Sequence, residues 1–162
     1  MANTYTQIYI HIVFAVKGRQ NLIHRSVQDE LYKYITGIIT NKGQKLIAIN
    51  GMQDHIHILI GLKADKPLSD IVRDIKANSS RFINEKGWMS ERFEWQTGFG
   101  AFSIGRTELS SVINYIENQE KHHQKIKFKN EYVGMLEQSA IEFDMKYIFD
   151  DVGDAAPTEL PT

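Results

Sequence analysis

The stretch Gly51-Met52-Gln53-Asp54-His55-Ile56-His57-Ile58-Leu59-Ile60 decides how this 162-residue chain folds and where its chemistry lies. Its apolar residues recur at every second position, which is the pattern of a β-strand whose side chains alternate between two faces. His55 and His57 therefore share one face, and the intervening isoleucines share the other. Two imidazoles side by side on a rigid strand can hold one divalent metal ion, although a half-buried strand that happens to carry two histidines is the commoner case.

The rest of the chain supplies the partners of this strand. Alternating apolar residues predict strands over 5–16, 45–50, 54–61 and 99–104. Apolar residues at helical spacing predict helices over 26–41, from Pro67 to Gly87, over 107–123 and over 129–139. A tight turn near Gly51 joins two of the strands into a β-hairpin. The order β-α-β-β-α-β-α predicts an α+β fold with a single ferredoxin-like (RRM-like) sheet and helices packed on it.

Composition narrows the class of protein. We place one folded domain at residues 1–149 and expect residues 150–162, which are acidic and rich in small side chains, to be disordered. The chain has no cysteine, which excludes disulfides, zinc–thiolate sites and thiol nucleophiles. No apolar run approaches the roughly 18 residues that span a bilayer, and no signal peptide is visible. We therefore expect a cytoplasmic protein without a membrane partner.

The formal net charge of −1 conceals an asymmetry along the chain. Residues 137–162 carry seven acidic residues and one lysine, a sum of −6, so residues 1–136 carry +5. A basic body suits a polyanionic partner better than the total charge suggests, although the same surplus is common in proteins that never bind nucleic acid.

A second group of polar residues lies on the helix predicted over 107–123. Tyr115 and Gln119 are one turn apart on one flank of its apolar stripe, so they point together toward whatever lies beside the packed face. A tyrosine hydroxyl can attack phosphorus and form a covalent intermediate, and an amide oxygen can bind a metal ion. Without the two histidines, a tyrosine in this position would most often serve packing alone.

Taken together, these segments resemble the single-tyrosine HUH transposases of bacterial insertion sequences, including the REP-associated tyrosine transposases. HUH denotes a histidine, a hydrophobic residue and a histidine, here His55-Ile56-His57. The resemblance covers roughly residues 1–147 in the family's order. Besides the histidine strand it includes the segments 10–14, 72–80 and 95–103, and the run Tyr115-Ile116-Glu117-Asn118-Gln119-Glu120-Lys121-His122-His123.

The resemblance implies specific roles. His55, His57 and Gln119 would bind Mg²⁺ or Mn²⁺, and Tyr115 would be the nucleophile. The substrate would be single-stranded DNA with hairpin (imperfect palindrome) ends, cleaved through a 5′-phosphotyrosine intermediate and later rejoined. The family is typically a homodimer with shared active sites, in which the histidines come from one chain and the tyrosine helix from the other.

Other residues have less specific candidate roles. The basic residues expected to contact the DNA backbone are Lys17, Arg19, Arg73, Lys76 and Arg81. His11, His122 and His123 lie where they could approach the site, although each is more often structural. Asp54 could orient a ligand histidine, or could equally cap the hairpin turn. A phenol of pKa about 10 is almost wholly protonated at neutral pH, and no motif indicates which group accepts its proton.

Two other functions are compatible with the sequence. The first is a domesticated, non-catalytic protein that binds single-stranded or hairpin DNA. The second is a metal-dependent hydrolase in which water attacks and Tyr115 only packs. A transposase requires the Tyr115 hydroxyl to lie within several ångströms of His55 and His57, in the same chain or in a partner chain.

Overall fold

The protein is built on one four-stranded antiparallel sheet. The structure, a computed structural model, describes residues 3–124, 126–144 and 148. The strands are β1 (Tyr9–Ala15), β2 (Lys45–Gly51), β3 (His55–Gly61) and β4 (Gly100–Ile104), and they lie in the order β2-β3-β1-β4. Helix α1 (Arg25–Asn41) connects β1 to β2, and α2 (Leu68–Lys86) connects β3 to β4. This order confirms the expected ferredoxin-like fold. The segment 150–162, expected to be disordered, lies outside the described residues.

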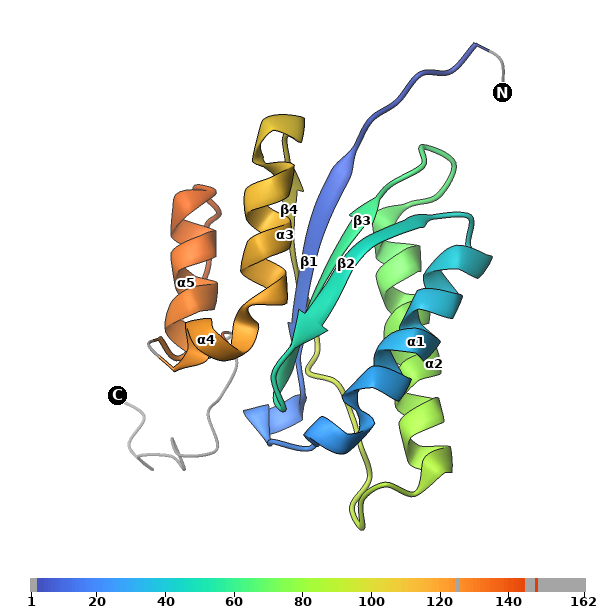
Figure 1. The fold of residues 1–162 in the computed structure, drawn as a ribbon, viewed down its shortest axis with the longest axis vertical. Coiled ribbons are helices and arrows are strands. Elements are labelled where there is room, and N and C mark those ends of the chain that lie inside the picture. Colours follow the sequence, from blue (N-terminus) through green and yellow to red (C-terminus); the bar gives the residue numbers. More distant parts are fainter. Residues whose placement is uncertain (1–2, 125, 145–147, 149–162) are drawn as a thin grey trace.

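Helices α1 and α2 cover one face of the sheet (Figure 1). The isoleucines of β3 point to this face together with alternate residues of β1. They form an apolar core with the stripes of the two helices, and its fully buried members include Ile12, Phe14, Ile35, Ile56, Ile58, Ile60, Ile71 and Ile75. Burial of this surface is the main term that stabilises the domain.

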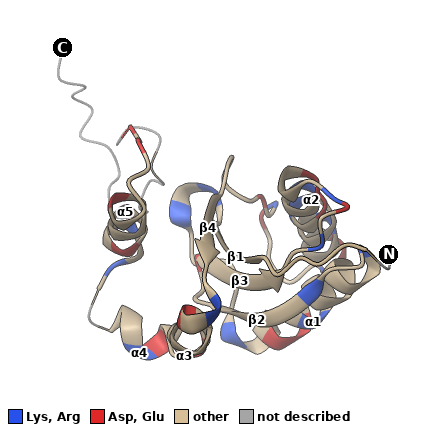
Figure 2. Ribbon diagram, turned by 90° about the horizontal axis from the view of Figure 1, so that it is seen from above, with Lys and Arg blue, Asp and Glu red and all other residues tan. Residues whose placement is uncertain are grey.

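The opposite face of the sheet carries the remaining helices, so that the sheet lies between two groups of helices (Figure 2). After β4 comes a short 3-10 helix η2 (Arg106–Glu108), followed by α3 (Leu109–Glu117), α4 (Gln119–His123) and α5 (Phe128–Gln138). A 3-10 turn η1 (Lys17–Arg19) follows β1. Among the described helices, none is long and apolar enough to cross a membrane.

The helix predicted over 107–123 is divided in the structure. The backbone at Asn118 has φ −103° and ψ 27°, which separates α3 from α4. The Asn118 side chain donates a hydrogen bond to the backbone oxygen of Asn114 at 2.8 Å, and such local bonds compete with the regular helix. The apolar stripe ends at Ile116 and α4 has only polar residues, so apolar periodicity did not locate the break.

The β2–β3 turn that precedes the histidines needs glycine at position 51. A Cβ atom at Gly51 would lie 2.2 Å from the backbone oxygen of His55. The same oxygen accepts a hydrogen bond from the backbone nitrogen of Met52 at 3.0 Å. This close approach fixes the start of β3 and therefore the position of both histidines.

Candidate active site

His55 and His57 point together from β3 to the face of the sheet that α3, α4 and α5 cover, as their alternation predicts. Both are almost fully buried, with 1% and 0% of their surface exposed. His55 Nδ1 lies 2.7 Å from Asp54 Oδ1, and Asp54 also accepts a hydrogen bond from Arg19 Nε at 3.0 Å. Asp54 therefore orients a candidate ligand histidine, which was one of its two expected roles.

His11 of β1 is a direct neighbour of this pair. Its Nε2 atom lies 2.8 Å from Nδ1 of His57, and the two rings stack with centroids 5.0 Å apart. Strand β1 pairs with β3 in antiparallel register, with Val13 opposite His57, which places His11 on the same face. The contact holds the His57 ring at a fixed angle, so that its Nε2 atom points away from the sheet.

Tyr115 and Gln119 approach the histidines from α3 and α4 of the same chain. The Tyr115 ring lies 5.6 Å from the His57 ring and 6.2 Å from the His11 ring, measured between centroids. Gln119 is fully buried, and its Oε1 lies 3.2 Å from Nε2 of His55. The Tyr115 ring therefore lies beside His57 within one chain.

Two hydrogen bonds from Asn50 of β2 hold this tyrosine helix in place. Asn50 Nδ2 donates to the backbone oxygens of Ile116 and Glu117 at 3.0 and 3.1 Å, at the point where α3 ends. Asn50 lies opposite His57 in the β2–β3 register. The strand pair that carries the histidines therefore also fixes the position of the tyrosine.

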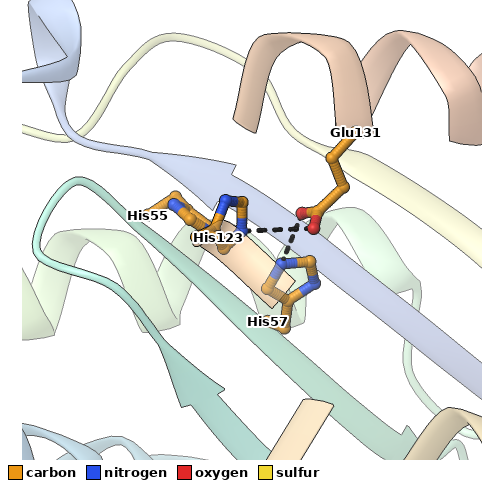
Figure 3. A group of neighbouring side chains, drawn as sticks. All are labelled: His55, His57, His123 and Glu131. Carbon is orange, nitrogen blue, oxygen red and sulfur yellow. Dashed lines mark hydrogen bonds and ion pairs between the residues drawn. The ribbon is translucent and has the colours of Figure 1, made fainter. Parts of the chain in front are cut away.

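Glu131 of α5 completes the group, although the sequence reasoning did not select it. His55, His57, His123 and Glu131 each offer one ligand atom, and these atoms all lie within 4.8 Å of one another. Figure 3 shows the Glu131 carboxylate pointing from its helix toward His57 and His123. A sequence signal was present, because Glu131 is three residues after Phe128 and so interrupts the apolar face that continues with Tyr132 and Leu136.

The polar atoms of this group converge on one another. His55 Nδ1 faces a carboxylate and His123 Nδ1 faces the backbone oxygen of Ile126 at 2.9 Å, so each neutral ring carries its proton on Nδ1. Their Nε2 lone pairs then face Gln119 Oε1 at 3.2 and 3.0 Å. Lone pairs that converge in this way repel unless a proton or a metal ion lies between them. The donor set therefore fits a divalent metal ion.

Burial controls the charge of the site. Burial lowers the pKa of His57 to about 4, and it lowers the pKa of His11 to about 3. Both rings are therefore neutral at pH 7 and have a lone pair available. Burial alone would raise the pKa of Glu131, but the neighbouring His123 and His57 side chains outweigh it and hold this carboxyl ionised.

Burial and the charge of Glu131 both raise the pKa of Tyr115, whose hydroxyl is within hydrogen-bonding reach of the Glu131 carboxylate. The metal-free protein therefore keeps this phenol protonated. Its activation needs added positive charge in the site.

A groove of about 560 Å³ opens onto these residues. Its lining includes Tyr115 and Val112 from α3 and Glu131 and Met135 from α5, with Phe102 of β4 among the residues between them. Both helices lie on this face of the sheet (Figure 1). Tyr115 is open to this groove, whereas His55 and His57 beneath it are closed off from solvent.

Three of the five basic residues expected to contact DNA meet in a different groove. Arg73, Lys76 and Arg81 line a hollow of about 1000 Å³ between α2 and the segment 92–99, on the side of the sheet away from Tyr115. The Lys76 ammonium group donates to the backbone oxygens of Gln96 and Gly98 at 2.6 and 2.7 Å.

The other two basic residues lie near η1, away from this groove. Lys17 forms an exposed ion pair with Glu94 at 3.0 Å, and Arg19 is buried beside Asp54. All five basic residues have polar partners within the chain, but Lys17, Arg73 and Arg81 are more exposed than Lys76 and Arg19.

Comparison with known protein families shows that the chain is a transposase. Residues 4–119 match the model of a family described as "Transposase IS200 like", which is well over half of the chain. The chain belongs to the IS200-like transposase family. The match ends at Gln119, so His123 and Glu131 lie beyond the segment that the family model covers.

Individual relatives agree with this assignment. The ISDra2 transposase TnpA of Deinococcus radiodurans is 24% identical over 120 residues, which cover 70% of this chain and 84% of that protein. A crystal structure from Deinococcus radiodurans R1, described as a transposase, has a TM-score of 0.59 and 23% identity, and covers 72% of this chain and 94% of that one. A REP-associated tyrosine transposase bound to a REP hairpin has a TM-score of 0.59 at 16% identity, and covers 76% and 73%. The two structural likenesses concern the fold.

Proposed function

We propose that this transposase cleaves and rejoins single-stranded DNA through a covalent 5′-phosphotyrosine linkage at Tyr115. His55 and His57 hold Mg²⁺ or Mn²⁺, with Gln119 as a third ligand. The observation that carries the proposal is the position of the tyrosine, whose ring lies 5.6 Å from that of His57 beside a set of converging lone pairs. A tyrosine that served packing alone would not need a buried polar site beside its ring.

The proposed reaction needs no external energy source. The Tyr115 oxygen attacks the phosphorus, the bond from phosphorus to the 3′ oxygen breaks, and the DNA leaves with a free 3′-OH. When bound, the metal ion polarises the phosphate and neutralises the charge that develops on it. Glu131 lies within hydrogen-bonding reach of the phenol and orients it. Over the reaction, the proton lost by Tyr115 balances the proton gained by the leaving 3′ oxygen. Attack by a DNA 3′-OH on the phosphotyrosine reverses the linkage and restores the tyrosine.

The proposed substrate has a hairpin beside the cleaved single strand. The solved relative bound to a REP hairpin supports this proposal, since it shares the fold. We assign the duplex part to the groove lined by Arg73, Lys76 and Arg81, because arginine and lysine side chains neutralise phosphates. Lys17 is assigned to the same backbone, and Arg19 contributes by holding Asp54.

The direct test is a cleavage assay on a single-stranded oligonucleotide with a hairpin, in the presence of Mn²⁺. The proposal expects a protein–DNA adduct that survives denaturation and a released strand with a 3′-OH. Binding without cleavage would instead identify a non-catalytic DNA-binding protein. Cleavage without any adduct would identify a hydrolase that uses water, and would leave Tyr115 with a packing role.

We also propose a homodimer with shared active sites, in which the tyrosine helix of one chain serves the histidines of the other. Light scattering at micromolar concentration measures the oligomeric state. Mixing the Tyr115→Phe and His57→Ala variants tests the sharing, because each variant contributes the half that the other lacks. Restored cleavage in the mixture supports shared sites, whereas an inactive mixture supports sites formed within single chains, as the position of Tyr115 in one chain would allow.

A further inference from the structure

We propose that Glu131 is a ligand of the metal ion, so that helix α5 completes the metal site. The proposal deepens the function proposed above and rests on it for the presence of the metal. It adds a carboxylate from a helix that lies beyond the segment matched by the family model, which ends at residue 119.

The position of the carboxylate supports this assignment. Glu131 Oε1 lies 3.0 Å from Nε2 of His57, and Oε2 lies 3.1 Å from Nε2 of His123. Neighbouring ligand atoms on an octahedral ion, bound at about 2.1 Å, are about 3.0 Å apart. Only 3% of the Glu131 side chain is exposed, so the carboxylate faces the histidines and not the solvent (Figure 3).

The charges of the candidate ligands also support Glu131 as a ligand of the metal ion. Two neutral imidazoles and one amide carry no charge, whereas Mg²⁺ and Mn²⁺ favour carboxylate oxygens. A buried carboxylate is unfavourable unless a cation pairs with it. In the part of the chain that the structure describes, Glu131 has no lysine or arginine partner, and its neighbours are His57, His122, His123 and Tyr115. A divalent ion bound by His55 and His57 would supply the missing positive charge.

The packing of α5 sets the depth at which Glu131 enters the site. Phe128 stacks on the His55 ring with centroids 3.9 Å apart and an angle of 8° between the planes. One turn later, Tyr132 packs on β4 at Gly100, where a Cβ atom would lie 2.8 Å from the tyrosine ring. Glu131 lies between these two anchors, so its carboxylate reaches the histidines only while α5 is seated on the sheet.

This arrangement couples metal binding to the position of α5. An ion that binds Glu131 together with His57 of β3 joins the helix to the sheet. Binding of the ion must then stabilise the seated helix, because a ligand stabilises the conformation to which it binds. The coupling gives a readout that does not depend on DNA cleavage.

The test titrates Mn²⁺ into the full-length chain and follows binding by calorimetry. Glu131→Gln keeps the shape of the side chain and removes its charge, and Glu137→Gln on the exposed side of α5 is the matched control. We expect Glu131→Gln to weaken Mn²⁺ binding at least about 10-fold, because even indirect supports of metal ligands contribute 10- to 100-fold. The control should bind Mn²⁺ like the wild type.

Hydrogen exchange measured by mass spectrometry provides the second readout. Mn²⁺ should slow exchange of the amides in Phe128–Gln138 of the wild type and of Glu137→Gln, and should leave Glu131→Gln unchanged. If Glu131→Gln does not fold, Glu131→Asp replaces it. The shorter carboxylate should then bind Mn²⁺ with an affinity below that of the wild type.

The outcomes separate this inference from the proposed function. Unchanged Mn²⁺ affinity in the folded Glu131→Gln variant overturns the ligand role. Faster DNA cleavage by the same variant also overturns it, because it would show that the carboxylate occupies the position of a substrate phosphate. Absence of Mn²⁺ binding by the wild type overturns both proposals. Tight Mn²⁺ binding that depends on Glu131, without any DNA adduct, leaves the ligand role intact and overturns only the strand-transfer function.

Discussion

The two faces of strand β3 differ in what they carry, although their residues alternate along one stretch of seven residues. Ile56, Ile58 and Ile60 pack against α1 and α2 in an apolar core. His55 and His57 meet side chains from α3, α4 and α5, which combine polar groups of Gln119 and Glu131 with the aromatic ring of Phe128. Both faces are buried, so burial alone does not tell them apart.

The difference shows how this fold separates stability from chemistry. On the isoleucine face, contacts are non-directional, and stability scales with the apolar area that is buried. On the histidine face, the polar contacts are directional, and lone pairs that converge there favour a cation. Because the strand backbone is shared, the apolar core holds the histidines rigidly without contributing atoms to the site. The comparison predicts that substitutions on the two faces have different consequences.

The largest effect on activity is expected for the tyrosine. Tyr115→Phe removes the attacking oxygen and should reduce formation of the covalent DNA adduct by more than about 10³-fold, while the fold is retained. Denaturing gels of a labelled hairpin substrate measure the adduct. Tyr34→Phe on the isoleucine side is the control, because its ring stacks on Phe82 and the ring is kept. Adduct formation by Tyr115→Phe would show that another residue is the nucleophile.

Neighbouring residues of β3 provide the sharpest contrast. His57→Ala should weaken Mn²⁺ binding by about 100-fold or more, with a smaller change in folding stability. Ile58→Ala should lower the free energy of unfolding by about 2–5 kcal/mol through the cavity it leaves, and should keep the metal affinity of the folded fraction. Urea unfolding and Mn²⁺ titration of both variants measure the two quantities. Equal losses of Mn²⁺ affinity and of unfolding free energy in both variants would show that the two faces do not have separate roles.

Asp54 supports the site from outside it. Asp54→Asn weakens the acceptor that holds His55 Nδ1 at 2.7 Å and removes the charge that pairs with Arg19. Loss of such an orienting carboxylate typically lowers metal affinity by about 10- to 100-fold. Glu94→Gln, which removes an exposed ion pair with Lys17, should leave Mn²⁺ affinity unchanged. Equal Mn²⁺ affinity of Asp54→Asn and the wild type would show that Asp54 only caps the hairpin turn.

The stability of the metal-free protein should depend on pH through the histidine face. The folded-state pKa of His57, about 4, and that of His11, about 3, lie below the ordinary value of 6.5. Below pH 6.5 the unfolded chain therefore binds more protons than the folded chain. The free energy of unfolding should therefore be highest above pH 6.5 and should fall as the pH decreases from about 6.5 toward 4.

Urea unfolding in the presence of EDTA across this range measures the effect. His11→Asn should flatten the pH profile, because the variant has one fewer depressed histidine. Ile58→Val on the other face should lower stability by about 0.5–1.5 kcal/mol at every pH. A profile that is flat in the wild type would contradict the neutral state assigned to these two rings.

The smallest effects are expected in the basic groove on the isoleucine side of the sheet. Arg81→Gln should weaken binding of hairpin DNA a few-fold for every sequence, and should reduce the slope of log affinity against log salt by about 0.9. Lys33→Gln on the exposed side of α1 is the control for loss of one positive charge. Fluorescence anisotropy at several salt concentrations measures both variants. Equal slopes for Arg81→Gln and the wild type would show that this groove does not bind DNA phosphates.

Much of the fold followed from local patterns. The alternation of β3 predicted which face each histidine would occupy, and the helical stripes predicted α1 and α2 within a few residues. The pair Tyr115 and Gln119 was predicted to point toward the histidines, and it does so from one chain. These predictions succeeded because side-chain direction in strands and helices depends only on local periodicity.

Other features of the site escaped the sequence reasoning. The break at Asn118 coincides with a side-chain hydrogen bond to Asn114, which apolar periodicity does not register. Glu131 lies 74 residues from the His57 that it contacts, and its position in the site depends on how α5 packs on β4. A buried glutamate on an apolar helix face was the available signal, but that signal does not indicate the partner.

The sequence by itself determined the strand and helix pattern, the shared face of the two histidines and the resemblance to a transposase family, because each depends on neighbouring residues or on motif order. Only the tertiary structure decided which side chains meet across the sheet. It brought His11, His123 and Glu131 to the histidine pair and placed Arg73 and Arg81 on the opposite side. Contacts between distant segments are decided by how whole elements pack, and no local pattern encodes that packing.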